Sequence, residues 1–185
     1  MAIVDILFIT ITIIWIGEFF VFKNRRVDDD KSEDTSSFSP ILFSTIGVIT
    51  VSIFSREFSF LSYTNTSFMW IGVLFYSFGV FIRYWGMVKL GKQFTRNVNV
   101  ATDDQIVGTG PFRFLRHPLY SGLLSTLIGI SIYTGSIIGF LMIFIVFIPF
   151  LLKRIRLEEA MLTKAFGPDY KKWAKTRKRL VPFLY

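Results

Sequence analysis

The 185-residue chain contains no cysteine and only one histidine. The lack of cysteine excludes disulfide frameworks, cysteine-ligated zinc, iron–sulfur clusters and thiol nucleophiles, and a single histidine excludes a histidine-rich metal site. Charged residues are also scarce at 18%, whereas 52% of the residues are hydrophobic and phenylalanine alone occurs 22 times. Disorder is excluded because so much apolar surface would collapse or insert into a bilayer. The composition therefore predicts an integral membrane protein without a metal site.

Three apolar runs are long enough for helices that cross a bilayer, which takes about 20 residues. They cover residues 3–22, 40–60 and 68–90. A fourth apolar stretch, residues 119–152, is too long for one span and too short for two independent spans with a loop. It predicts a tight helical hairpin of somewhat short or tilted helices, turning near 133–136.

The fold class predicted is therefore all-α, with five transmembrane helices in a single membrane domain over residues 1–185. The first two spans belong to residues 1–67. The third span, a long polar loop, the hairpin and a C-terminal catalytic helix belong to residues 68–185. Residues 153–180 have the pattern of a basic amphipathic helix lying along the membrane surface, interrupted at Gly167-Pro168.

The net charge of +8 is unevenly distributed along the chain. Segments 23–39, 89–118 and 153–185 hold 19 of the 21 lysines and arginines, and alternating spans place all three segments on one side. The positive-inside rule then predicts an external N-terminus and a cytoplasmic C-terminus. Beside such apolar runs, the basic excess indicates anionic lipid headgroups as a partner and no nucleic acid.

Glu18 lies late in the first span and has two interpretations. It is either a functional acid inside the membrane or, as we favour, a residue at the interface near Lys23.

Chemistry must be assembled from the polar loop at 91–118 and the segment after Leu152, because polar residues are sparse elsewhere. Four motifs occur there in order: Gly110-Pro111-Phe112-Arg113-Phe114-Leu115-Arg116-His117-Pro118-Leu119-Tyr120-Ser121-Gly122, Arg154-Ile155-Arg156-Leu157-Glu158-Glu159, Phe166-Gly167-Pro168-Asp169-Tyr170 and Leu180-Val181-Pro182-Phe183. Taken singly, each also fits a turn, a solvated ion pair or a packing surface. Their joint order and spacing favour a functional site.

These motifs resemble those of the isoprenylcysteine carboxyl methyltransferase family and its small prokaryotic relatives, integral membrane enzymes that use S-adenosylmethionine. The resemblance extends from about Lys89 to the C-terminus, roughly half of the chain. It implies that S-adenosylmethionine binds in a cytoplasmic pocket roofed by the 91–118 loop, and that a lipophilic or prenylated acceptor enters from the bilayer.

The resemblance also implies the roles of individual residues. Glu158 is implied as a catalytic carboxylate that contacts the cofactor, and Arg154 as the catalytic arginine nearest the methyl-accepting end of the substrate. Phe112 replaces a tyrosine common in the family, which keeps stacking but loses a hydroxyl contact. The residues implied to bind the cofactor are Asn99, Gln105, Ile106, Val107, Phe112, His117, Pro118, Leu119, Tyr120 and Glu158.

The chemistry agrees with this assignment. Arg154 and Glu158 are four residues apart and share one helix face, so one can reach an anionic acceptor while the other meets the cofactor's ammonium group. Methyl transfer from a sulfonium mainly requires positioning and exclusion of water. A carboxylate acceptor needs no base, whereas an amine would require one such as Glu159 or His117.

Three other functions are left open at this point. The first is a methyltransferase acting on a phospholipid amine or on another small lipophilic amine or thiol. The second is a sterol-reductase-like enzyme that uses NADPH, and the third is a membrane scaffold without catalysis.

Overall fold

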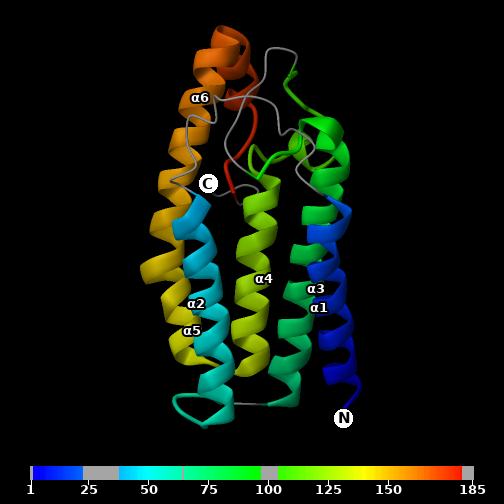
Figure 1. Cartoon of the computed structure of the whole chain (residues 1–185), viewed down its shortest axis with the longest axis vertical. Helices are drawn as coiled ribbons and strands as arrows, with labels where there is room; N and C mark the ends of the chain where they lie inside the picture. Colours follow the sequence, from blue (N-terminus) through cyan, green and yellow to red (C-terminus); the bar gives the residue numbers. More distant parts are fainter. Residues whose placement is uncertain (1, 23–37, 64, 97–103, 181–185) are drawn as a thin grey trace.

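The computed structural model describes residues 2–22, 38–63, 65–96 and 104–180. All regular elements among them are helical, and the long ones lie side by side in one bundle (Figure 1). The elements in chain order are α1 (Ile3–Val21), α2 (Phe38–Glu57), α3 (Thr66–Leu90), η1 (Gly91–Gln93), η2 (Gly110–Arg113), α4 (Pro118–Thr134), α5 (Ile137–Met142), η3 (Ile143–Phe147) and α6 (Ile148–Lys175).

The helices are those of an all-α integral membrane protein. By length and composition, the candidate spans are Ile3–Val21, Phe38–Glu57, Thr66–Gln93 and Ile137–Lys175. The 17-residue α4 is the shorter arm of the predicted hairpin and completes five spans. Most large side chains on α1 and α2, such as Phe20 and Phe43, are exposed, as lipid-facing residues are. The predicted fold class is confirmed.

The hairpin turns where the sequence predicts. Gly135 ends α4 with a φ of 66°, in the left-handed region that glycine enters without a steric penalty. The side chain of Ser136 then accepts a hydrogen bond from the backbone nitrogen of Gly139, which caps α5. The turn thus follows from two neighbouring residues that stop one helix and start the next.

Glycines let α3 and α4 pack with their backbones in close contact. On α3 they recur every seven residues at Gly72, Gly79 and Gly86, and on α4 at Gly122 and Gly129. A Cβ at Gly79 would lie 2.5 Å from the carbonyl oxygen of Gly122, and one at Gly72 would lie 2.4 Å from the backbone nitrogen of Tyr133. Small residues at such a seam are the usual basis of close helix packing in membranes.

The C-terminal helix begins earlier than the sequence predicts. Instead of a separate surface helix from residue 153, α6 continues the second arm of the hairpin, and Figure 1 shows it rising beyond the end of the bundle. A π-helical turn, Ile143–Phe147, precedes α6, because Pro149 cannot donate the next backbone hydrogen bond. The predicted interruption is confirmed at Gly167, whose φ is 55°.

Candidate active site

One pocket occupies the end of the bundle at which α1 and α3 finish and α2 and α4 begin (Figure 1). Its walls come from all the long helices and from the polar loop. They include Trp15, Glu18 and Phe19 of α1, Phe38, Ile41 and Thr45 of α2, Arg83 of α3, residues 104–107 and Phe112 of the loop, 116–120 at the start of α4, and Arg154, Glu158, Tyr170 and Trp173 of α6. The pocket therefore reaches from the polar end of the bundle into its apolar part.

The Arg-His-Pro motif is held beside the end of the C-terminal helix by short backbone pairing. The backbone nitrogen of Arg116 donates to the carbonyl of Lys178 at 2.7 Å, and that of His117 donates to the carbonyl of Arg179 at 3.2 Å. The hydroxyl of Ser121 donates to the carbonyl of Leu180. This pairing fixes the start of α4 against the segment that follows α6, which lies about 60 residues later in the sequence.

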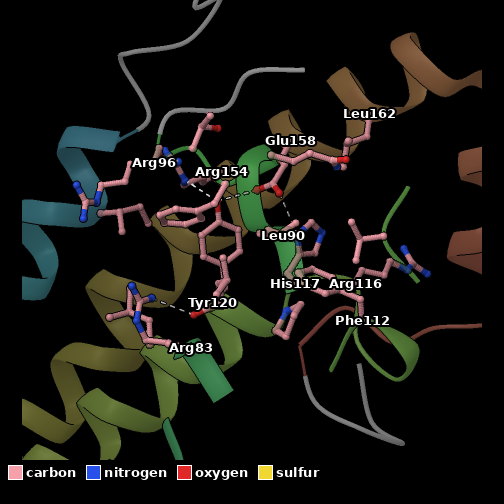
Figure 2. Close-up of a pocket in the computed structure, with 18 of the residues that line it drawn as sticks. Arg83, Leu90, Arg96, Phe112, Arg116, His117, Tyr120, Arg154, Glu158 and Leu162 are labelled. Atoms are coloured by element: carbon pink, nitrogen blue, oxygen red, sulfur yellow. Dashed lines mark hydrogen bonds and ion pairs between the residues drawn. The ribbon is translucent and has the colours of Figure 1, made fainter. Parts of the chain in front are cut away.

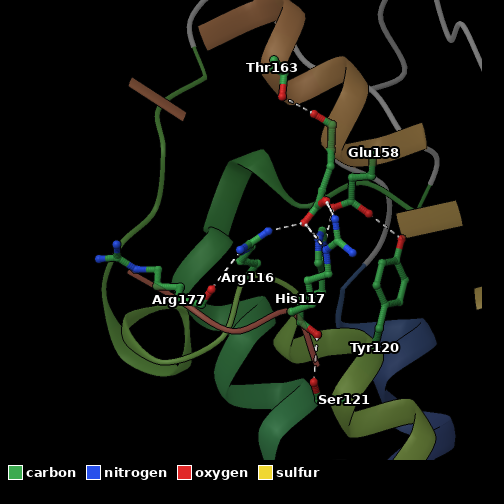
Figure 3. A network of polar contacts seen from close by, with 9 residues as sticks. Arg116, His117, Tyr120, Ser121, Glu158, Thr163 and Arg177 are labelled. Atoms are coloured by element: carbon green, nitrogen blue, oxygen red, sulfur yellow. Dashed lines mark hydrogen bonds and ion pairs between the residues drawn. The ribbon is translucent and has the colours of Figure 1, made fainter. Parts of the chain in front are cut away.

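His117 lies between two carboxylates. Its side chain is buried; Nδ1 is 3.6 Å from Glu158 Oε1 and Nε2 is 3.4 Å from Glu159 Oε1. Glu159 also forms ion pairs with Arg116 and with Arg179, each at 2.9 Å. His117, the two glutamates and the two arginines are therefore connected in one network of polar contacts (Figure 3). Burial disfavours a charged imidazole, but the two carboxylates outweigh it and raise the pKa of His117 to about 9.

Tyr120 joins the two residues predicted to be catalytic. Its hydroxyl donates to Glu158 Oε2 at 2.7 Å and accepts from Arg154 Nε at 2.7 Å. Arg154 is buried and also donates through Nη2 to the backbone carbonyl of Arg96 at 2.5 Å. Figure 2 shows Arg154 and Glu158 on one side of the Tyr120 ring and Arg83 on the other. Arg154 and Glu158 thus share one face of α6 as predicted, and Tyr120 of α4 bridges them.

The loop that follows α3 is fixed by a reciprocal side-chain bridge. The Gln93 amide donates to the carbonyl of Gln105 at 2.9 Å, and its oxygen accepts from the Gln105 backbone nitrogen at 3.3 Å. Phe112, also at the pocket wall, is buried, and its carbonyl accepts from Arg177 Nε at 2.9 Å. The loop and Phe112 are therefore held in place where they line the pocket.

The structure brings the predicted site residues to one place. Those lining the pocket are Gln105, Ile106, Val107, Phe112, His117, Pro118, Leu119, Tyr120, Arg154 and Glu158. Asn99 lies outside the described residues. Their roles remain proposals, but the grouping of residues from three distant segments in one pocket follows from the fold.

Sequence reasoning missed the membrane-side wall of the pocket. Glu18 is 2% exposed and forms an ion pair with Arg83, whose Nε donates to Glu18 Oε2 at 2.9 Å. The carboxylate thus faces α3 inside the bundle, and its expected position at the interface near Lys23 stays a prediction. The available signal was a charge of opposite sign in the third span, since charged residues within a membrane are rarely left unpaired.

Two buried polar groups at the end of the pocket that α6 borders lack a hydrogen-bond partner among the described residues. They are the Tyr170 hydroxyl and the indole nitrogen of Trp173. Buried polar groups are nearly always hydrogen-bonded, so this end of the pocket is suited to a polar ligand. Together with the Glu158 carboxylate and the Phe112 ring, these groups match a cofactor that has an ammonium, a ribose and an aromatic base.

A direct check of the His117 environment is available because the chain has one histidine. We expect its imidazole NMR signal to titrate with a midpoint near pH 9, since the free-histidine pKa of 6.5 is raised by Glu158 and Glu159. A raised pKa means that the cluster's stabilisation is complete below about pH 6.5 and is lost as the pH rises through 9. A midpoint at or below 6.5 would show that the two carboxylates do not hold the ring.

Comparison with known proteins identifies the family from a part of the chain that supplies many of the residues lining this pocket. The model of the phospholipid methyltransferase family matches residues 67–169, which run from α3 through the loop and the hairpin into α6. The chain belongs to the phospholipid methyltransferase family. The residues matched include every described residue predicted for the site.

Curated relatives of this phospholipid methyltransferase family member have a more specific name. A probable protein-S-isoprenylcysteine O-methyltransferase of Oryza sativa subsp. indica is 29% identical over 131 residues, 70% of this chain and 65% of the relative. The protein-S-isoprenylcysteine O-methyltransferase of Schizosaccharomyces pombe is 29% identical over 112 residues, 60% of this chain and 48% of the relative. This chain thus spans about half to two thirds of the relatives it matches.

Proposed function

We propose that the protein transfers the methyl group of S-adenosylmethionine to a lipophilic acceptor, with the carboxylate of an isoprenylcysteine-like molecule as the preferred acceptor. The observation that carries the proposal is the joining of Tyr120, Arg154 and Glu158 in a pocket that is lined by charged side chains together with many apolar and aromatic ones. Family membership and the names of the relatives support it.

The cytosolic half of the pocket holds the cofactor in this proposal. The cofactor, when bound, supplies an electrophilic methyl group on a sulfonium. Glu158 receives its ammonium group, Phe112 and residues 105–107 contact the adenosine, and Tyr170 and Trp173 offer hydrogen bonds to its polar edge. The ion network around His117 keeps Glu158 in place, so the carboxylate is positioned before the cofactor arrives.

A carboxylate acceptor fits the charge state of the site better than an amine does. An amine must lose a proton to a base, but His117 is already protonated at neutral pH because its pKa is about 9. Glu159 is bound by Arg116, Arg179 and His117, and the Tyr120 hydroxyl donates to Glu158. An ionised carboxylate needs no base and meets Arg154 at the boundary between the two halves.

The acceptor enters from the bilayer in this proposal. The apolar half of the pocket has walls from both α1 and α2, through Phe19 and Ile41. The main helix contacts of α1 are with α3, and those of α2 are with α4 and α5. We propose that a prenyl or acyl chain reaches Tyr120 along the part of the pocket that these two helices line.

The membrane orientation proposed is an external N-terminus with the pocket at the cytoplasmic face, where basic residues of α6 meet anionic headgroups. Because the chain has no cysteine, single cysteines report the orientation. Thr66→Cys, exposed at the start of α3, should react with an impermeant maleimide on intact cells. Lys172→Cys, exposed at the opposite end of the bundle, should react only after permeabilisation. The reverse pattern would invert the orientation.

Binding and transfer measurements test the function itself. Calorimetry on the detergent-purified protein should show binding of S-adenosylmethionine and of its demethylated product, but not of NADPH. Radiolabelled methyl transfer to N-acetyl-S-farnesylcysteine should exceed transfer into a lipid extract. Absence of heat with both sulfur compounds would reject a methyltransferase, and binding of NADPH alone would favour the reductase.

A phospholipid amine is the second candidate acceptor, favoured by the family to which the chain belongs. It predicts transfer into phosphatidylethanolamine in the same assay, with a rate that rises with pH as a base becomes available. The carboxylate proposal predicts no such rise. The pH dependence of the initial rate therefore separates the two acceptors even if both are methylated.

A further inference from the structure

A second polar site lies in the membrane half of the same pocket, about 10 Å below the end of α3. Arg83 is seven residues before Leu90, and a helix rises 1.5 Å per residue. Its guanidinium is clamped on Glu18 through Nε and Nη2, and Nη1 donates to the carbonyl of Leu119 at 3.2 Å. Both charged residues line the pocket. An ion pair at this depth is costly to desolvate, and such pairs in membranes mark functional sites.

The ion pair with Glu18 does not use all the N–H donors of Arg83. A guanidinium carries five N–H groups, and three of them are used by Glu18 and Leu119. The Arg83 side chain is 14% exposed, compared with 2% for Glu18. Arg83 is thus the partner that presents hydrogen-bond donors to the pocket, while the carboxylate is occupied by the arginine.

Two neighbouring donors point to the same kind of ligand. Trp15, one helical turn before Glu18 on α1, and Thr45 on α2 both line the pocket. The Trp15 indole nitrogen and the Thr45 hydroxyl are buried without a hydrogen-bond partner among the described residues. A buried donor without an acceptor is costly. This part of the wall therefore offers donors from α1, α2 and α3 and carries no net charge.

We infer that this wall, formed by Trp15, Glu18, Thr45 and Arg83, binds a neutral carbonyl oxygen of the lipophilic acceptor. The donors require an oxygen acceptor on the ligand, and the neutralised Arg83 favours an uncharged oxygen over a second anion beside Glu18. An anionic group is left to Arg154 on the other side of Tyr120 (Figure 2). This inference rests on the proposed function, because it assigns a second recognition point on the same acceptor.

The carbonyl has two chemical sources, an amide next to a prenylated cysteine or an ester of a glycerolipid. Equilibrium binding distinguishes them with two pairs of probes. N-acetyl-S-farnesylcysteine is compared with S-farnesylthiopropionate, which keeps the prenyl thioether and the carboxylate but lacks the acetamide. Diester phosphatidylethanolamine is compared with its diether analogue, which lacks both ester carbonyls. We expect about tenfold tighter binding of the carbonyl-bearing member of one pair.

Substitutions then test whether the wall causes the tighter binding of the carbonyl-bearing probe. The neutral double variant E18Q/R83Q removes the charges together and should reduce the preference to within twofold. Thr45→Val keeps the shape of the wall, and Trp15→Phe keeps an aromatic ring while it removes the indole N–H. Both leave the ion pair, and each should reduce the preference about threefold. Arg56→Gln is the matched control, because Arg56 of α2 also donates to a backbone carbonyl of α4, that of Tyr133, at the opposite end of the bundle.

The outcomes separate this inference from the proposed function. A preference for the amide or the ester that falls in the wall variants and persists in Arg56→Gln supports the inference and names the source. No preference in either pair, no binding of any probe, or a preference that all wall variants retain would overturn it. Failure of cofactor binding or methyl transfer in the wild type would instead reject the proposed function.

Discussion

Replacing Glu158 by glutamine is expected to weaken the binding of S-adenosylmethionine roughly 10- to 100-fold. The substitution keeps the size of the side chain but removes the charge that faces the cofactor's ammonium group. Hydrogen bonds to charged groups contribute about 1.5–3 kcal/mol, and each 1.4 kcal/mol is a factor of ten. The Tyr120 hydroxyl, which donates to Glu158 at 2.7 Å, would retain an amide oxygen as its acceptor, so the pocket should keep its shape. Calorimetric titration measures the effect.

Arg154→Ala separates the two halves of the proposed site. Arg154 contacts Glu158 only through the Tyr120 hydroxyl in the hydrogen bonds described above, so its loss should leave the cofactor Kd within about threefold and lower kcat by about 100-fold, as removal of a positioning charge does. The control for Glu158→Gln is Glu57→Gln, which removes the negative charge of an exposed carboxylate at the other end of α2. Equal cofactor affinity in the wild type, Glu158→Gln and Arg154→Ala would reject the assigned roles.

Gly79→Ala is expected to destabilise the protein by about 3 kcal/mol. A single methyl group at this position would lie 2.5 Å from the carbonyl oxygen of Gly122 and 2.6 Å from the backbone nitrogen of Thr126. Neither atom belongs to a flexible side chain, so α3 and α4 must move apart. Overpacking typically costs about 1–3 kcal/mol, and a clash between two backbones lies at the upper end of that range. Thermal unfolding in detergent measures the loss.

The matched control for this prediction is Gly47→Ala in the middle of α2. There the nearest atom to a new Cβ, Met142 Cε, is 3.8 Å away, an ordinary contact. Both substitutions gain the same intrinsic helix preference of alanine over glycine, about 1 kcal/mol, so the difference between them isolates the packing effect. If the two variants unfold at the same temperature, the α3–α4 seam does not determine stability.

Separation of α3 and α4 would also disturb the pocket. Arg83 is four residues after Gly79, and its Nη1 donates to the Leu119 carbonyl across the same interface. Tyr120 follows Leu119 on α4. A Gly79→Ala protein that remains folded should therefore bind both cofactor and acceptor more weakly, which the same titrations would reveal.

The sequence by itself determined the number and approximate limits of the spans, because hydrophobic length and the cost of exposed backbone in lipid allow few alternatives. It also determined the stops at Gly135 and Gly167, whose positive φ angles depend on local chemistry. The order of the Arg-His-Pro and Arg-x-x-x-Glu-Glu motifs indicated the site residues, and all of those described line one pocket.

Only the tertiary structure decided which distant residues meet. The ion pair of Glu18 with Arg83 joins helices 65 residues apart in sequence, and no local pattern specifies such a partner. The continuation of α6 from the hairpin and the clamp of two carboxylates on His117 likewise depend on how the helices pack. Hydropathy acts within one segment, whereas charge pairing and close backbone contact act between segments. The glycines Gly72, Gly79 and Gly129 bring α3 and α4 into register.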